Sequence, residues 1–233
     1  SAAATLSAIG SDSKTFASCA SSESPIMTIN EGTLAFAANK DGTANAAMEL
    51  TPDSTTGRAT ATKTFTDPTD FTDYDGTQTG ADEDPVEMDV YITEPQYLDR
   101  IALMVDVNDG LFQSDYYVYE FINGEPIAVE RAPDHLLATD YSVEGFDRDD
   151  VLARTELRNL VETVFRIDKP VSNSGWNHFS VPRGEFQRVG ATAGKNWSTV
   201  RAVRVTFVGL AGGSGAALRF DEIKIIGGSQ RAL

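Results

Sequence analysis

Aromatic side chains that could stack on a sugar ring are the first chemically informative feature of this sequence. The face of an aromatic ring packs well against the apolar C–H face of a pyranose. Tyr117 and Tyr119 share the strand parity of Phe121, so we expect these three rings in the core. The candidates for ligand contact are Trp176, Tyr116, Phe112 and Tyr74.

Carboxylates form a second candidate site. Asp221 has the same strand parity as Ile223 and Ile225, which we expect to face the core. An inward carboxylate must be ion-paired, hydrogen-bonded or bound to a metal, because burying a bare charge is very costly. Glu31 lies at the start of the first expected strand. It would lie close to Asp221 if the two termini of the sandwich are adjacent. Two interpretations stay open: a structural Ca²⁺ held by Asp221 and Glu31, or Asp221 held by hydrogen bonds alone.

The sequence lacks the motifs of the common catalytic sites. It has no phosphate-binding Gly-x-x-x-x-Gly-Lys and no His-Glu-x-x-His. The only histidines are His135 and His178, so a Ser-His-Asp triad would need one of them. A glycosidase requires only two carboxylates at a suitable separation, which a chain with 35 acidic residues meets too easily to be informative. We therefore predict a protein that is not an enzyme, and keep a glycan-cleaving hydrolase, or a fragment of one, as the alternative.

The charge balance excludes several kinds of partner. The 233 residues include 19 Lys and Arg against 35 Asp and Glu, which gives a formal net charge of −16. Such a surface repels phosphate backbones and anionic lipid head groups, so nucleic acid and membrane surfaces are not expected partners. The sequence has no run of about 18 apolar residues that could cross a bilayer. The single cysteine, Cys19, excludes an internal disulfide.

Period-two hydrophobicity dominates the elements that must position these side chains. Apolar residues alternate with polar ones at 86–92, 101–107, 117–121 and 203–207. Such alternation predicts strands with one face on a core and the other in solvent. Turn signals such as Asn108-Asp109-Gly110 separate the strands. The sequence predicts an all-β, two-sheet antiparallel jelly-roll sandwich.

Two segments depart from this pattern. Residues 1–25 are rich in Ser and Ala, and we expect an irregular N-terminal arm before a jelly-roll domain at 26–229. Within the domain, an insertion at about 124–174 contains apolar residues at helical intervals over 147–167, with Asp147 as a plausible N-cap. We expect one helix in this insertion.

The C-terminal third resembles a known family. Trp176-Asn-His-Phe179-Ser-Val181 is followed by Asn196-Trp197-Ser-Thr-Val200 and then by Arg219-Phe220-Asp221-Glu-Ile223. This series is similar to the galactose-binding-like β-jelly rolls that occur as carbohydrate-binding modules. The resemblance implies a jelly-roll fold and a binding rather than a catalytic role. Similar modules are found in bacterial surface proteins and in phage tail or virion proteins.

Together these features favour a non-catalytic, carbohydrate-binding-like module that serves adhesion, attachment or structure in a surface or virion assembly. Its expected partners are a glycan or neighbouring protein subunits, and its expected location is extracellular or on a virion or cell surface. A protein-binding scaffold without sugar binding is a further alternative, because the fold alone does not determine the function.

Overall fold

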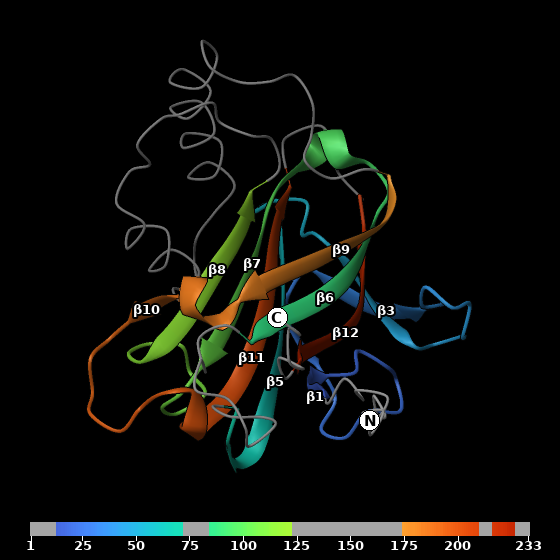
Figure 1. The fold of residues 1–233 in the computed structure, drawn as a ribbon. Coiled ribbons are helices and arrows are strands. Elements are labelled where there is room, and N and C mark those ends of the chain that lie inside the picture. Colours follow the sequence, from blue (N-terminus) through green and yellow to red (C-terminus); the bar gives the residue numbers. More distant parts are fainter. Residues whose placement is uncertain (1–12, 72–83, 123–173, 210–215, 227–233) are drawn as a thin grey trace, which may run out of the picture.

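The computed structural model describes residues 13–71, 84–122, 174–209 and 216–226. The described residues form two stacked antiparallel sheets, with β6 and β9 in front of β7, β8 and β11 (Figure 1). The predicted helix within 147–167 and Tyr74 lie outside the described residues. Within the described ranges, no helix has the length and apolarity that crossing a membrane requires.

Six strands form the first sheet. Its order is β3 (Thr33–Ala37), β4 (Ala47–Thr51), β12 (Leu218–Ile226), β6 (Pro85–Ile92) and β9 (Gly175–Pro182), and β1 (Ser13–Ala17) pairs with the second half of β12.

Six more strands form the second sheet. Its order is β10 (Gln187–Val189), β8 (Tyr116–Ile122), β7 (Leu98–Asp106), β11 (Val200–Gly209), β5 (Arg58–Thr69) and β2 (Thr28–Glu31). Three single-turn 3₁₀ helices lie at Pro95–Tyr97, Arg183–Glu185 and Trp197–Thr199. The predicted two-sheet antiparallel sandwich is thus confirmed.

Alternation along the strands builds the core between the sheets. Val90 and Ile92 of β6 have no exposed surface, and neither do Ile101 and Val105 of β7. Full burial of one such side chain stabilises the fold by about 1.5–3 kcal/mol. The other face of β6 therefore points away from the core, which leaves Glu87, Asp89 and Tyr91 on the outside of the first sheet.

A line of aromatic rings closes one end of the core. Trp197 is buried, stacks on Tyr117 with ring centroids 4.7 Å apart, and meets Phe186 edge-on at 5.4 Å. Phe16 lies 6.4 Å from the same indole and stacks on Phe71 at 3.9 Å. Trp197 is therefore a core residue and cannot present its ring to a ligand.

Part of the expected irregular arm belongs to the first sheet. Ser13–Ala17 forms β1, in which Phe16 and Ala17 are fully buried. A strand of five residues with one large apolar side chain carries little periodicity. Its position depends on the contact of Phe16 with Phe71, which no local pattern of residues 1–25 reveals.

The loop after β7 folds back over the outer face of the second sheet. The buried carboxylate of Asp106 accepts hydrogen bonds from the backbone N–H groups of Asn108, Gly110 and Phe112, each at 2.8 Å. Phe112 has a φ of 58°, a left-handed conformation that is unfavourable for a bulky residue. The three hydrogen bonds hold the loop in this shape and place the Phe112 ring against the sheet.

We predict that Asp106→Ala lowers the free energy of unfolding by about 2–3 kcal/mol, because three backbone donors lose their acceptor. Asp109→Ala is the matched control, since Asp109 lies in the same loop and, among the described residues, accepts a hydrogen bond only from the exposed N–H of Leu111. The control should cost less than about 0.5 kcal/mol. Urea denaturation of both variants measures the difference, and equal losses would contradict the role given to Asp106.

Candidate functional site

A row of four side chains crosses the outer face of the first sheet. Tyr91 of β6 pairs with Trp176 of β9 on one side and with Arg219 of β12 on the other. Arg219 in turn pairs with Glu49 of β4. Because directly paired residues lie on the same face of a sheet, all four side chains point away from the core. We call Tyr91 and Trp176 the aromatic pair.

Direct contacts hold the aromatic pair in place. The two rings meet edge-to-face, with centroids 5.4 Å apart and an interplanar angle of 71°. The Arg219 guanidinium lies 5.2 Å from the centroid of the Tyr91 ring, and its Nε donates to Glu49 Oε2 at 2.6 Å. Both rings are half-buried, so each keeps part of its surface open to solvent. The pair is thus a fixed apolar surface with an ion pair at one end.

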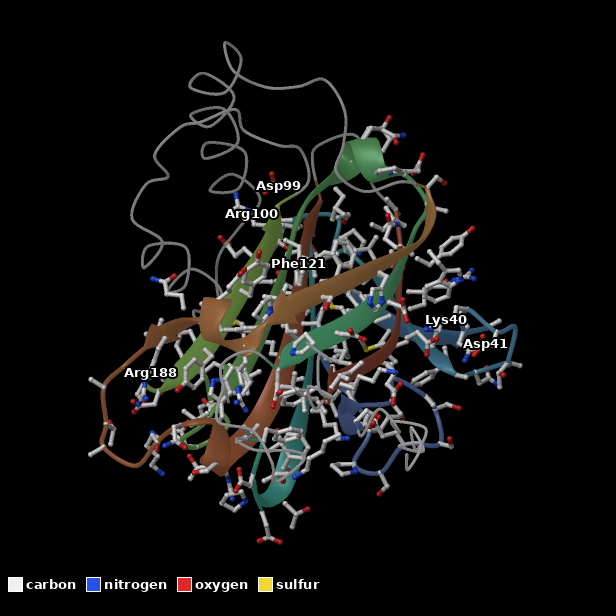
Figure 2. All side chains as sticks on the ribbon, viewed as in Figure 1. Lys40, Asp41, Asp99, Arg100, Phe121 and Arg188 are labelled. Carbon is white, nitrogen blue, oxygen red and sulfur yellow. The ribbon has the colours of Figure 1, made fainter. Side chains whose placement is uncertain are left out.

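A second row lies beside the aromatic pair. Asp89 lies two residues before Tyr91 on β6. It pairs with His178 of β9, two residues after Trp176, and with Asp221 of β12, two residues after Arg219. The Nδ1 atom of His178 lies 3.0 Å from Asp89 Oδ1, and Lys40 donates to Asp89 Oδ2. Lys40 reaches the sheet from the loop between β3 and β4, where Figure 2 shows it next to Asp41. Asp89 therefore joins two exposed polar side chains.

These contacts shift the ionisation of the second row. Burial raises the pKa of Asp89, but the hydrogen bonds from Lys40 and His178 outweigh it and hold the pKa below its ordinary value. The hydrogen bond to Asp89 raises the pKa of Lys40. Both groups are therefore ionised over a wide range around neutral pH.

The structure separates the four predicted aromatic ligand contacts. Trp176 lies in the first row, whereas Tyr116 and Phe112 are buried, with 1% and 0% exposure. Both belong to a small apolar cluster on the outer face of the second sheet, where the Arg204 guanidinium lies 4.2 Å from the centroid of the Phe112 ring. Neither ring is open to a ligand, because the loop held by Asp106 folds onto the sheet. The fourth candidate, Tyr74, lies outside the described residues.

Tyr91 is an aromatic residue of the site that was not among the predicted ligand contacts. A signal for it exists, because Tyr91 alternates with the core residues Val90 and Ile92 and must therefore face outward. Its partner Trp176 lies 85 positions further along the chain by residue number. No pattern along the sequence indicates that pairing.

The two candidate metal ligands lie in different sheets. Glu31 ends β2 in the second sheet, and its carboxylate is ion-paired with Arg58. Asp221 is in β12 of the first sheet, is buried, and accepts the backbone N–H of Glu222 at 3.0 Å. Within the described parts of the chain, no group of three or more His, Cys, Asp or Glu side chains is arranged to hold a metal ion.

The register of Asp221 differs from the expected one. A β-bulge between Asp221 and Ile223 places one extra residue in β12. Phe220 and Ile223 both have no exposed surface in the core, and Asp221 lies opposite Asp89 on the outer side. Parity counted from Ile223 therefore gives the wrong face, because a bulge interrupts the period of two.

We predict that Asp89→Asn lowers the free energy of unfolding by at most about 1 kcal/mol at neutral pH, since solvent screens the exposed partners. The pKa of Asp89 is lowered by folding, so its contribution is present above about pH 4 and disappears as the pH falls through the folded-state pKa. The difference from the unchanged protein should therefore shrink in acid. Lys40→Met should show the same profile, and a difference that grows in acid would contradict the assignment.

Sequence comparison finds no relative: neither a protein-family model nor a curated protein matches the chain. Structural comparison finds the family 11 carbohydrate-binding module of the cellulosomal cellulase Lic26A-Cel5E of Clostridium thermocellum, with a TM-score of 0.53 and 12% identity over 97% of this chain and 100% of that chain. The solution structure of CtCBM11 is similar at a TM-score of 0.50 and 12% identity, over 95% of this chain and 98% of that chain. At such identity the likeness concerns the fold. The chain is a two-sheet sandwich of the kind that family 11 carbohydrate-binding modules adopt.

Proposed function

We propose that this protein is a non-catalytic carbohydrate-binding module, and that its glycan lies on the outer face of the first sheet across the aromatic pair. The observation that carries the proposal is the half-exposed Tyr91–Trp176 contact, fixed by Arg219 and Glu49. Rings that are already held in place lose little conformational freedom when a ligand stacks on them. The fold shared with carbohydrate-binding modules supports the same function.

The outer face of the second sheet is a weaker candidate for stacking. Its apolar side chains, among them Met104 and Val118, are buried, and so is the Tyr116 ring. An aromatic ring must have an accessible face before a sugar can pack against it. The first sheet meets this requirement with Tyr91 and Trp176.

The charges around the aromatic pair favour a neutral glycan. Arg219 and Lys40 are both ion-paired with carboxylates of the same face, Glu49 and Asp89. Glu87 adds a further carboxylate beside Asp89 on β6, and the whole chain carries a formal charge of −16. A uronate or sulfate group would meet this field with repulsion. Unsubstituted hexose polymers are the ligand class that fits best.

A module of this kind acts by attachment. It holds the polypeptide or particle that carries it on a glycan without changing the glycan. We place this role outside the cell or on a cell or particle surface, because polymeric glycans are exposed there.

We predict that Trp176→Ala and Tyr91→Ala each weaken binding of a neutral soluble glycan by about fivefold or more, since stacking contacts of aromatic rings contribute on the order of 1 kcal/mol or more. Affinity electrophoresis against mixed-linkage β-glucan, agarose and an unsubstituted galactan identifies the ligand, and calorimetry measures its Kd. Alginate and carrageenan, which carry uronate and sulfate, should not bind.

The matched control is Leu111→Ala, which removes an apolar side chain that is 57% exposed in the loop over the second sheet. This variant should bind as the unchanged protein does. Binding that survives both aromatic substitutions but is lost with Leu111→Ala would overturn the choice of face. Failure of all three neutral polymers to bind would overturn the function itself.

A further inference from the structure

His178 is an exposed polar residue beside the aromatic pair on the outer face of the first sheet. It follows Trp176 by two positions on β9, so both side chains point to the outer face of the first sheet. The His178 side chain is 53% exposed. A sugar stacked on Trp176 would therefore bring its hydroxyl groups near this imidazole.

Asp89 determines which ring nitrogen of His178 carries the proton. An ionised carboxylate can only accept hydrogen bonds, so the 3.0 Å contact to Asp89 Oδ1 assigns the hydrogen to Nδ1. In the neutral imidazole, Nε2 then has a free lone pair. Lys40, bound to the other oxygen of Asp89, keeps that carboxylate ionised.

The neighbouring carboxylate does not occupy Nε2. Glu87 Oε2 lies 3.7 Å from Nε2, which is beyond hydrogen-bonding distance. Two acceptors also gain nothing from contact with each other. Among the residues that the structure describes, the charged groups that face His178 are Asp89 and Glu87 of β6, with Lys40 bound to Asp89, and they leave Nε2 available as an acceptor.

We infer that His178 Nε2 accepts a hydrogen bond from a hydroxyl group of the bound glycan, and that Asp89 is the positioning residue that holds the imidazole in the acceptor tautomer. This inference rests on the proposed function and adds a specificity residue to it. It requires a ligand with a free hydroxyl beside the ring that stacks on Trp176, so substitution at that hydroxyl should weaken binding by about fivefold, the size of one net hydrogen bond.

Protonation of His178 removes the acceptor. The imidazolium has donors at both nitrogens, and Nε2–H would then point toward Glu87 rather than accept from a hydroxyl. The inference therefore applies to the neutral imidazole, in which Nε2 carries a lone pair.

The test combines calorimetry and NMR on the full chain. With whichever of mixed-linkage β-glucan, agarose or galactan binds, His178→Ala should weaken affinity about fivefold, the size of one net hydrogen bond. Ser180→Ala, on the same face of β9, is the control and should behave as the unchanged protein.

The ¹⁵N shifts of the His178 ring report the tautomer without any ligand. The Nδ1–H form should dominate in the unchanged protein, and Asp89→Asn, whose amide can donate to Nδ1, should increase the Nε2–H form and weaken binding at neutral pH. A dominant Nε2–H form in the unchanged protein would overturn the inference.

A second result would also overturn it: His178→Ala that binds as the unchanged protein does. If Trp176→Ala still weakens binding in that case, the proposed function stands without the role of His178. If no neutral polymer binds, both fall together.

Discussion

The register of β6 against β12 and β9 is the constraint on which the outer face of the first sheet depends. β6 places Val90 and Ile92 in a core that excludes water, and this burial fixes which face of the strand turns outward. A slip of one residue would bring Tyr91 and Asp89 into the core and expose the valines and isoleucines. The core thus determines that Tyr91 meets Trp176 and that Asp89 meets His178.

The same constraint explains why the two faces of the sandwich differ. On the second sheet, a loop held by the Asp106 carboxylate returns onto the outer face and buries Phe112. On the first sheet, the polar groups bind one another across strands, and the two rings keep accessible surface. An accessible aromatic face therefore arises where cross-strand ion pairs, rather than a folded loop, occupy the space beside the rings.

Local patterns predict much of this fold and little of its site. Alternation over 86–92 and 101–107 identifies strands and core residues, and the outward parity of Tyr91 follows from the same pattern. Pairing between strands far apart in the chain, such as Tyr91 with Trp176, leaves no local signal. Local patterns also do not predict the bulge beside Asp221 or the left-handed conformation of Phe112. The bulge depends on the pairing of β12 with β6, and the conformation of Phe112 depends on the buried carboxylate of Asp106.

The most direct test of the binding face is a map of backbone amide shifts on addition of the neutral glycan that binds. The largest changes should fall on β6 and β9 around Tyr91, Trp176 and His178, with smaller ones near Arg219. Changes confined to the outer face of the second sheet, around Thr62, Met104 and Arg204, would contradict the proposed location and place the ligand on the opposite side of the sandwich.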